Sequence, residues 1–406
     1  MTSLSELDQD PRAPAFVQDP YTFYAKARGY GPYFHWKQYG IVCCTSCDDI
    51  NALLRDRRLG RQILHVATRE ELGWPPPDPR HADFDAIERH SLLELEPPEH
   101  TRLRGLVNRA FVSRRIERLR PRIAEIATGL IDRFPKGGVD LLQAYATPIP
   151  VIVIAELLGI DREHAPQLLD WSHRMVRMYQ FGRTTEDELG AAAAAREFAT
   201  FVRGEIAERR LAAPGDDLLS HLIRQESEEG RLSEDEIVTT TILLLNAGHE
   251  ATVHAIANAV KAILESGLNP ARMLADAASI EAAIEETLRY DPPLHMFTRY
   301  ALEDLELEGG VRLARGERIG LLLGAANRDP ARFHDPDRFD PARKPGPHVT
   351  FGAGIHFCLG APLARLELAV ALPILFQRLP RLHLASPPRY RDSYHFHGLQ
   401  WLEVAW

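Results

Sequence analysis

Cys358 is the residue of this sequence best placed for metal chemistry. It lies with three glycines in the segment FGAGIHFCLG, residues 351–360, directly before a helical pattern that begins at Ala361. The start of a helix stabilises a thiolate, and glycines let the backbone approach a flat group closely. A single thiolate without Cys or His partners at zinc-finger spacing favours an axial bond to haem iron over a four-ligand zinc site. The alternative is the usual one for a lone cysteine, a small core residue.

A long helical pattern contains a second group of residues that can do chemistry. Ser233 and Glu236 have the spacing of a capping box and Gly267 provides a stop, so we predict a helix from residue 233 to about 266, roughly 48 Å long. Its middle, residues 242–260, is apolar almost all round, which indicates burial. This stretch nevertheless contains Asn246, Gly248, His249, Glu250 and Thr252. A buried acid and a helix glycine both cost stability, so the group indicates either catalysis or a satisfied structural cluster.

The segment around Cys358 resembles the cysteine-ligand loop of the cytochromes P450, and four more segments are similar to motifs of that family. They are the Glu-x-x-Arg pair Glu286 and Arg289, the oxygen-activation stretch AGHEAT at residues 247–252, PPEHTRLR at residues 97–104, and NRDPARFHDPDRFDPAR at residues 327–343. The resemblance covers the chain in order from about residue 15 to the end. It implies a mainly α fold with small β-sheets, in which residues 1–406 form a single domain with a long central helix over the haem.

The resemblance implies a role for each matching residue. Cys358 would be the proximal ligand of the iron in haem b, with Phe351 packed beside the thiolate. Glu286 and Arg289, one helical turn apart, would form a structural ion pair behind the haem. The haem propionates would be bound by His100, Arg104, Arg299 and His356. The other cofactor-binding residues that the resemblance implies are Ala247 and Gly360.

The alcohol that usually follows the catalytic acid is missing. Glu250 and Thr252 are the catalytic residues that the resemblance implies, but most family members follow the acid with threonine, whereas Ala251 stands there in this chain. A helix rotates about 100° per residue, so we expect the Thr252 hydroxyl to point away from the place of the missing one. Glu250, ordered water and a substrate hydroxyl would then deliver protons. In the alternative, a local widening of the helix beside Gly248 turns Thr252 inward.

The activity implied by the resemblance is that of a haem-thiolate monooxygenase. Such an enzyme inserts one oxygen atom from O2 into an organic substrate, with electrons from NAD(P)H that arrive through a ferredoxin reductase and a ferredoxin. The sequence has no GxxxxGK loop and no GxGxxG with a following acid, so NAD(P)H must act through another protein. Two alternatives are peroxide-driven oxygenation and a non-enzymatic haem protein that binds a ligand. The acid at Glu250 disfavours both, because peroxide-using relatives replace it and a ligand-binding protein does not need it.

We expect the substrate to be a small or medium-sized molecule, largely apolar or aromatic, with some polar groups. The residues that the resemblance places at the pocket are Met178, Phe181, Leu243, Ala247, Leu294, Met296, Phe297 and His397. His395 and His397 alternate as on one face of a strand, so they either meet the substrate or are plain surface residues.

Charge and composition exclude several classes of protein. The formal net charge of −9 disfavours a general binder of nucleic acid or of membrane surfaces. The longest apolar runs, residues 148–155 and 368–376, fall well short of the roughly 18 residues that span a bilayer, and no export signal begins the chain. We therefore expect a soluble, cytoplasmic protein without a membrane anchor. The four cysteines of the chain are too few for a disulfide framework, and Cys43, Cys44 and Cys47 are expected in the core or at a sheet edge.

Residues 102–122 form a basic segment in this acidic chain. They contain eight arginines and one acid, Glu117, and eight minus one gives a local charge of +7. The resemblance places the segment beside the cysteine side of the haem, where an acidic ferredoxin would be steered. We expect docking on Arg109, Arg114 and Arg115; the alternative is a plain solvated helix face.

The remaining sequence predicts the elements that position these residues. Strands are expected at residues 39–45 and in a hairpin within residues 302–323, where Gly309 and Gly310 separate two alternating runs. Helices are expected within residues 95–135, 160–210 and 276–290 and at Ala361–Arg378, and long ordered loops at residues 73–80 and 329–348.

His249, Glu250 and His254 read HExxxH, which is one residue longer than the HExxH motif of zinc enzymes. Five residues turn a helix by about 500°, so the two histidines do not share a face. The spacing therefore gives no support for a zinc site on this helix alone.

Overall fold

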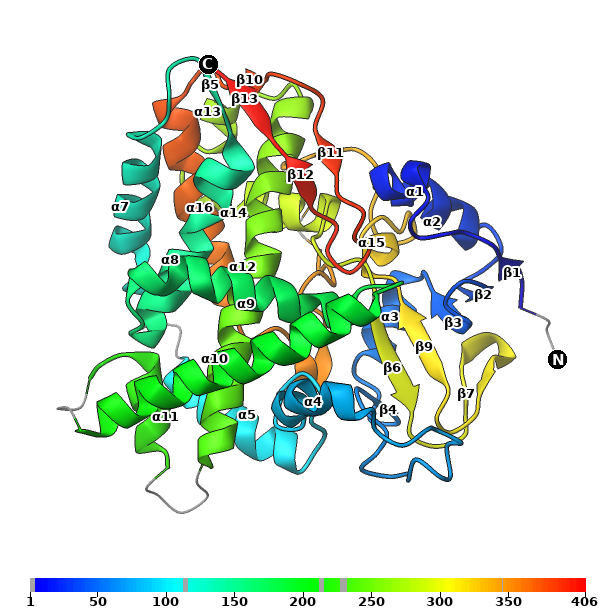
Figure 1. Cartoon of the computed structure of the whole chain (residues 1–406). Helices are drawn as coiled ribbons and strands as arrows, with labels where there is room; N and C mark the ends of the chain where they lie inside the picture. Colours follow the sequence, from blue (N-terminus) through cyan, green and yellow to red (C-terminus); the bar gives the residue numbers. More distant parts are fainter. Residues whose placement is uncertain (1–3, 112–115, 212–214, 227–231, 345) are drawn as a thin grey trace. The chain divides into compact units, whose positions relative to one another are not determined.

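The computed structural model describes residues 4–111, 116–211, 215–226, 232–344 and 346–406 (Figure 1). The chain divides into two compact units, neither of which is continuous in sequence. The first comprises Met1–Ile63, Arg120–Pro148 and Ala251–Trp406, and the second comprises Leu64–Leu119 and Ile149–Glu250. Helices form most of the regular structure of the described residues, which confirms the expected mainly α class with small sheets. None of the described helices combines the length and the apolar character needed to cross a membrane.

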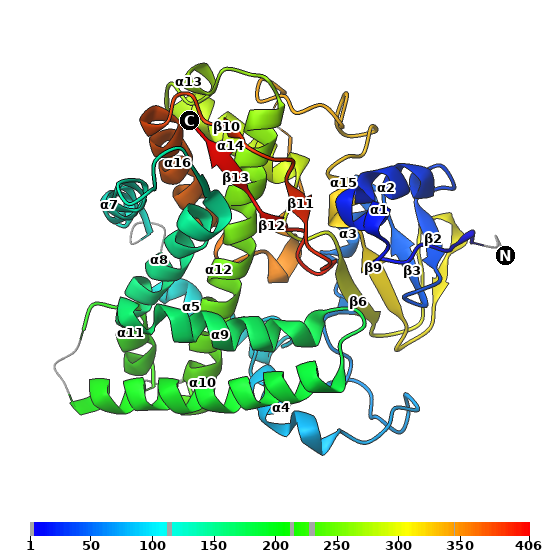
Figure 2. The ribbon, with the colours of Figure 1, turned by 45° about the horizontal axis from the view of Figure 1, so that its top comes forward.

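The first unit contains a six-stranded sheet. Its strands, in the order in which they pair, are β1 (Glu6–Leu7), β2 (Tyr33–Trp36), β3 (Ile41–Cys44), β9 (Arg318–Leu321), β6 (Phe297–Ala301) and β4 (Leu59–Gly60). The short helices that pack beside it (Figure 2) are α1 (Pro14–Gln18), α2 (Pro20–Arg28), α3 (Cys47–Leu53) and α15 (Leu323–Ala326). The expected strand at residues 39–45 is confirmed by β3. Cys43, Cys44 and Cys47 are buried in this core, as expected, and burial raises the pKa of each thiol.

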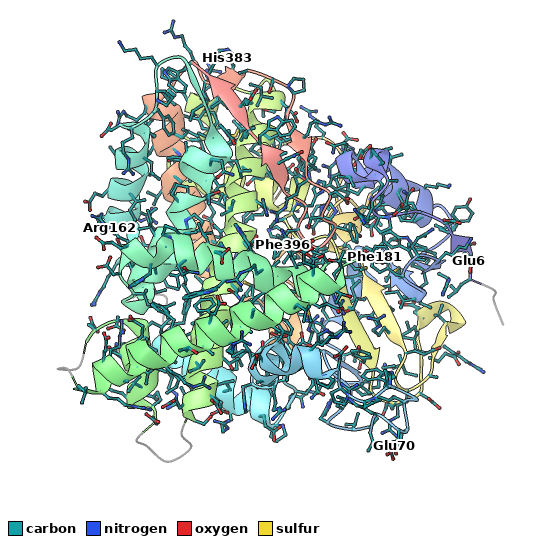
Figure 3. All side chains as sticks on the ribbon, viewed as in Figure 1. Glu6, Glu70, Arg162, Phe181, His383 and Phe396 are labelled. Carbon is teal, nitrogen blue, oxygen red and sulfur yellow. The ribbon has the colours of Figure 1, made fainter. Side chains whose placement is uncertain are left out.

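Smaller sheets complete the β structure of the first unit. β7 (Leu305–Glu306) and β8 (Arg312–Leu313) form the predicted hairpin around η5 (Glu308–Gly310). The other pairs are β10 (His383–Leu384) with β13 (Glu403–Ala405), β13 with β5 (Gly138–Asp140), and β11 (Arg389–Tyr390) with β12 (Leu399–Trp401). The expected strand through His395 and His397 is wrong. β12 begins only at Leu399, and both histidines lie in the irregular segment around Phe396 (Figure 3).

Helix α16 (Ala361–Arg378) begins and ends at the residues predicted from the sequence. It packs against α7 (Arg120–Ile131), and the Tyr145 hydroxyl of η2 (Leu142–Ala146) donates a hydrogen bond of 2.8 Å to its Ala371 carbonyl. Further helices of this unit are α13 (Pro270–Met273), α14 (Ala277–Tyr290) and η6 (Gly354–His356). The loop at residues 329–348 is irregular in its described residues, as expected. The helix that follows the cysteine loop, α16, is thus held in place by its packing against α7 and by the hydrogen bond from Tyr145.

The second unit is built from helices. α10 (Thr185–Leu211) runs alongside α9 (Ala165–Val176) and packs on α4 (Ala82–Glu88), with the Trp171 and Phe198 rings stacked at 5.0 Å (Figure 1). Further helices are η1 (Pro79–His81), α5 (Glu99–Ala110), η3 (Arg162–His164), η4 (Arg177–Tyr179) and α11 (Leu218–Arg224). Helix α8 (Pro148–Leu158) begins at the last residue of a first-unit segment. The helical pattern at residues 160–210 is thus confirmed as two helices with short turns.

α12 (Glu234–Glu265) is the long helix predicted from the capping box. The Ser233 N–H donates to Glu236 Oε2 at 2.8 Å and the Glu236 N–H donates to Ser233 Oγ at 3.2 Å, so both members of the box are satisfied. Gly267 follows with a φ of +68°, a left-handed conformation that suits glycine. The helix has 32 residues, and the boundary between the two units falls within it, after Glu250.

Candidate functional site

Cys358 lies in the loop between η6 and α16, and its side chain is exposed. Its N–H donates a hydrogen bond of 3.0 Å to the Phe351 carbonyl, and the Phe357 N–H donates one of 3.1 Å to the Gly354 carbonyl. These bonds fold the loop back on itself. α16 begins three residues after Cys358, so the positive end of its dipole lies near the thiol. The local structure agrees with the predicted thiolate position and excludes a core cysteine.

Two glycines of this loop are required by the close approach of other protein atoms. Gly354 has a φ of +71°, and a Cβ there would clash with the Leu54 carbonyl oxygen. Gly352 has a φ of +68°, and its Cβ would lie 3.1 Å from the Phe297 ring. Both glycines therefore have a structural reason within the protein, which the sequence pattern did not reveal.

Arg365 of α16 joins the cysteine loop to α14. Its guanidinium lies 4.5 Å from the centroid of the Phe351 ring and donates two hydrogen bonds to Glu285, of 2.6 and 2.9 Å. His348 Nε2 lies 3.2 Å from the same carboxylate. Burial acts to raise the pKa of Glu285, but Arg365 and His348 outweigh burial and lower that pKa to about 2. The sequence analysis missed this cluster, because no local pattern relates residues 80 positions apart.

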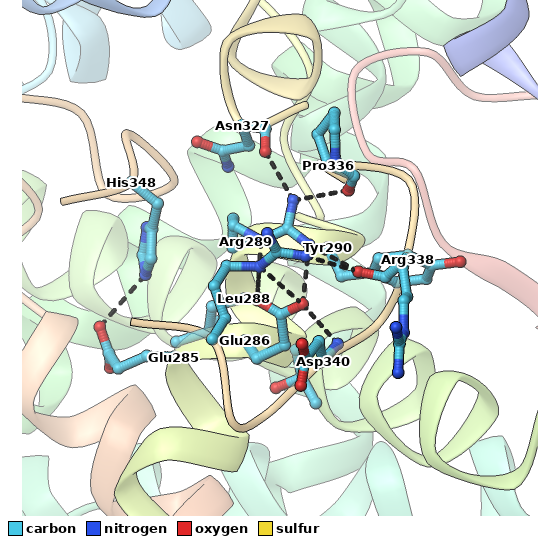
Figure 4. A network of polar contacts seen from close by, with 12 residues as sticks. Glu285, Glu286, Leu288, Arg289, Tyr290, Asn327, Pro336, Arg338, Asp340 and His348 are labelled. Atoms are coloured by element: carbon cyan, nitrogen blue, oxygen red, sulfur yellow. Dashed lines mark hydrogen bonds and ion pairs between the residues drawn. The ribbon is translucent and has the colours of Figure 1, made fainter. Parts of the chain in front are cut away.

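Glu286 and Arg289, one turn apart on α14, form the predicted ion pair (Figure 4). Both side chains are buried, and Arg289 donates to the two Glu286 oxygens at 2.7 and 2.8 Å. Its other hydrogen bonds reach the carbonyls of Asn327, Pro336 and Arg338. The Asp340 N–H donates to Glu286 at 2.8 Å. The pair therefore fixes the long loop that leads to the cysteine.

The other residues expected at the cofactor and substrate in the first unit lie on β6 and close to it in sequence. Arg299 is a buried residue of β6. Phe297 on the same strand, like Leu294 and Met296 just before it, is only partly buried. His356 is the last residue of η6, within the cysteine loop. The partly exposed apolar side chains are compatible with the lining of a pocket.

His397 belongs to a buried polar cluster. Its ring stacks on Tyr390, with centroids 3.9 Å apart, and its Nε2 lies 3.4 Å from Asp291 Oδ1. Asp291 also accepts hydrogen bonds from the hydroxyls of Tyr21 and Tyr390. Burial lowers the pKa of His397 well below its ordinary value. The alternative of a plain surface residue is excluded, and contact of His397 with substrate stays a prediction.

Glu250 on α12 forms a cluster with two histidines in the second unit. Its Oε1 lies 3.1 Å from Nε2 of His173 on α9 and 3.6 Å from Nε2 of His249. The Glu250 carboxyl is buried, whereas the His173 side chain is 54% exposed. Burial acts to raise the pKa of Glu250, but the two histidines outweigh burial and lower that pKa well below its ordinary value. An ionised acid in the middle of α12 is thus linked to an exposed side chain.

Within the second unit, α12 has one accessible side. Ala247 is exposed although most of the helix is buried. Leu243, four residues before Ala247, and Asn246, three residues after Leu243, are partly exposed. A Cβ on Gly248 would lie 3.0 Å from Ile154 of α8, so glycine lets the two helices approach. The accessible side carries the pocket residues expected on this helix, Leu243 and Ala247.

Thr252 is buried on the continuation of α12 in the first unit. The helix keeps α-helical structure at the residues on both sides of Ala251, from Asn246 to His254. The described structure therefore gives no support for a widened turn beside Gly248.

The residues expected at the cofactor and substrate in the second unit come from α5 and from the end of α9. His100 and Arg104 lie one turn apart on α5, and His100 is buried. Arg104 Nε donates to Asn108 Oδ1 at 3.2 Å. Met178 in η4 is partly exposed, and Phe181, in the turn before α10, is exposed (Figure 3). All four residues belong to the same unit as Glu250.

The basic segment is only partly available as a docking surface. Arg102 forms an ion pair with Glu236, which offsets its charge. Arg109 is exposed near the end of α5. Arg114 and Arg115 lie outside the described residues. Of the three arginines expected to dock a ferredoxin, Arg109 is therefore the one whose position the structure gives.

Several known proteins are similar to this chain along nearly its whole length. Residues 261–388 match a family model described as cytochrome P450. The chain is 38% identical over 397 residues to cytochrome P450 107B1 of Saccharopolyspora erythraea, with 96% of each protein covered. It is 37% identical over 411 residues to the 6-deoxyerythronolide B hydroxylase of the same organism, with 100% of this chain and 99% of the hydroxylase covered. A solved structure of P450BioI in complex with a hexadec-9Z-enoic acid ligated acyl carrier protein is similar with a TM-score of 0.89 and 33% identity, covering 97% and 99% of the two chains.

Proposed function

This chain belongs to the cytochrome P450 family of haem-dependent oxidoreductases, and from this premise we propose its reaction, its electron source and its class of substrate. It inserts one oxygen atom from O2 into a small or medium-sized organic molecule. Electrons come from NAD(P)H through a ferredoxin reductase and a ferredoxin, since the sequence has no dinucleotide-binding motif. Residues 1–406 act as one functional domain, because neither unit is continuous in sequence and α12 belongs to both.

The side chains expected around the cofactor have the chemistry that haem b requires. Cys358 offers an exposed thiol at the start of a helix, whereas Cys43, Cys44 and Cys47 are buried. Cys358 would bind the iron, and the thiolate-bound haem supplies the activation of O2. The residues that would hold the rest of the haem are Phe351, Gly360 and Ala247 for the ring, and His100, Arg104, Arg299 and His356 for the propionates.

The contact between His173 and Glu250 is the main support for a reaction that uses O2. One oxygen atom of O2 leaves as water, so the reaction consumes protons that must reach a buried position. Glu250 is buried and ionised, and His173, 3.1 Å away, is exposed. His173 would take protons from solvent and give them to Glu250 Oε1. Oxygenation driven by hydrogen peroxide brings its own protons and has no need of such a path.

The substrate proposed is a molecule with an apolar carbon chain or ring and at least one hydroxyl group. The apolar residues expected at the pocket support the carbon skeleton, since each is partly buried or exposed: Met178, Phe181, Leu243, Leu294, Met296 and Phe297. The names of two similar proteins also support a large carbon skeleton, because one names 6-deoxyerythronolide B and the other a hexadecenoic acid on a carrier protein. A hydroxyl on the substrate is proposed because Ala251 lacks the alcohol that usually follows the acid. The substrate's own hydroxyl would take the place of that alcohol in proton delivery.

Turnover of the purified holoenzyme tests the proposal. Macrolactones and hydroxylated fatty acids are first screened for a shift of the haem absorption band, which reports binding near the iron. With NAD(P)H, reductase and ferredoxin, a compound that binds should gain one atom of ¹⁸O from ¹⁸O2. Efficient oxygenation with hydrogen peroxide alone, and none with O2 and the full electron chain, would overturn the proposal.

A further inference from the structure

We propose that His173, His249 and Glu250 form a binding site for a zinc ion. The ligand atoms are Nε2 of His173, Nε2 of His249 and Oε1 of Glu250, and they all lie within 4.8 Å of one another. Two histidines and one carboxylate, with a fourth position left for water, are a common ligand set for zinc. His249 and Glu250 come from α12, whereas His173 comes from α9. The spacing argument against a zinc site concerned His249 and His254 on one helix, and His254 is not a ligand of this cluster.

The distances suit tetrahedral coordination. Bonds of about 2.0 to 2.1 Å at a tetrahedral centre place neighbouring ligand atoms about 3.3 Å apart. Glu250 Oε1 lies 3.1 Å from His173 Nε2 and 3.6 Å from His249 Nε2, so these two separations bracket that value. The third separation, between the Nε2 atoms of the two histidines, is at most 4.8 Å. The side chain of His173 is 54% exposed, so it has the freedom to adjust this separation.

His249 is held in the form that a metal ligand requires. Its Nδ1 lies 2.6 Å from the Leu245 carbonyl oxygen, which can only accept, so Nδ1 carries a proton and Nε2 of the neutral ring presents the lone pair that binds a metal ion. Metal-binding histidines are commonly oriented by such a hydrogen bond. The side chain is only 4% exposed, and its Nε2 has no hydrogen-bond partner among the described residues.

The described residues contain a second cluster of this type that is a weaker candidate. It consists of Asp291, His295 and His397. The hydroxyls of Tyr21 and Tyr390 already donate to Asp291, and all three side chains are buried, so no side chain of this cluster opens to water. His173 gives the first cluster an entry for the ion from solvent. We therefore expect zinc at the first cluster only.

Zinc at this site would stop the proton path. This consequence rests on the proposed function, in which Glu250 receives protons from His173. A zinc ion bonded to both side chains occupies the position between them, so it blocks proton transfer at Oε1. Removal of the ion by a chelator restores the path, and zinc would act as a reversible inhibitor of turnover with O2.

Equilibrium dialysis of the holoenzyme against zinc chloride tests the site without any reaction. We expect one zinc ion per chain in the wild-type protein, and affinity at least about tenfold weaker in His173→Ala, which removes an exposed ligand. His334→Ala is the matched control, because it removes another exposed histidine beside a single acid, Asp335, at 3.3 Å. Equal zinc affinity of the wild type and His173→Ala, or no zinc bound by the wild type at micromolar concentration, would overturn the proposal.

Activity separates this proposal from the proposed function. Zinc should lower product formation with NAD(P)H and ferredoxin in the wild type and in His334→Ala alike, and a chelator should restore it. If zinc binds as expected but product formation is unchanged, the zinc site stands and the role of Glu250 in proton delivery is wrong.

Discussion

The Arg365 guanidinium stands 4.5 Å from the centroid of the Phe351 ring, and the carbonyl of Phe351 accepts the N–H of Cys358. Arg365 is held in this position by its two hydrogen bonds to Glu285. Hydrogen bonding to Glu285 is the main reason why the pKa of Arg365 is raised, and attraction to Cys358 adds to it. Arg365 therefore brings a positive charge to the surroundings of Cys358. A residue outside every sequence motif thus supports the proposed iron ligand.

Glu285 should make the stability of the holoenzyme depend on acid pH. Its pKa in the folded protein is about 2, below the ordinary value of 4.5, so its contacts stabilise the fold fully above about pH 4.5 and lose their contribution as the pH falls toward 2. We expect the Tm of the wild type to fall more steeply across this window than the Tm of Glu285→Gln. Glu306→Gln, which removes the exposed partner of Arg312, should follow the wild type. Parallel curves for the wild type and Glu285→Gln would contradict this account.

Breaking the buried pair on α14 should deplete folded protein. Arg289→Ala removes the closest ion-pair partner of the buried Glu286 and leaves it only Arg343, at 3.4 Å, at a cost of up to about 3 to 5 kcal/mol. It also releases the loop carbonyls that Arg289 holds. We expect less haem per chain and an unchanged product in the fraction that remains folded. Arg12→Ala, which breaks an exposed pair with Asp392, is the control. Full haem content in Arg289→Ala would count against a structural role.

Cys358→Ala should remove the thiolate ligand. The reduced wild-type protein with carbon monoxide should show the shifted absorption band typical of thiolate-bound haem, and the variant should lack both this band and oxygenation activity. Cys47→Ala shortens a buried thiol of α3 and should keep the band. Retention of the shifted band in Cys358→Ala would show that another group binds the iron.

Local signals in the sequence predicted some elements well and missed the contacts between distant ones. The capping box at Ser233 predicted where α12 begins, because the ends of a helix depend on residues within a turn or two. The contact of His173 with Glu250 has no such signal, since it exists only once α9 has packed near α12. The alternation of His395 and His397 predicts a strand, and this prediction is wrong. That period of two also fits an irregular segment, in which the ring of His397 packs on Tyr390.

Electron transfer from an acidic ferredoxin should slow in Arg109→Glu. Arg109 is an exposed charge of the basic segment, so reversing it weakens the attraction that steers the ferredoxin. The loss in reduction rate should be largest at low salt and shrink as the ionic strength rises. Arg272→Glu on α13 makes the same charge change elsewhere and should keep the wild-type rate. Equal rates for the two variants, or a rate without dependence on ionic strength, would exclude docking at this segment.

Thr252→Ala and Glu250→Gln distinguish the two routes by which protons can reach the reacting oxygen. α12 is regular beside Ala251, so we expect the Thr252 hydroxyl to point away from the place of the missing alcohol. Product formed per NAD(P)H should therefore barely change in Thr252→Ala. Glu250→Gln removes the carboxylate that His173 contacts, and turnover should slow by about a hundredfold, because an amide does not carry the proton onward. A large rise in hydrogen peroxide release from Thr252→Ala, with product falling to match, would show that Thr252 is the working alcohol.

Ala251→Thr examines the role proposed for the substrate hydroxyl. In the wild type, a substrate that lacks its hydroxyl should give less product and more hydrogen peroxide per NAD(P)H than the hydroxylated compound, because one donor in the path is missing. A threonine at position 251 supplies a hydroxyl next to Glu250 from the protein itself. The difference between the two substrates should then shrink, while the difference in their binding, measured from the absorption shift, stays as it was. If the wild type forms the same amount of product per NAD(P)H from the two substrates, the substrate takes no part in proton delivery. Ordered water with Glu250 is then sufficient.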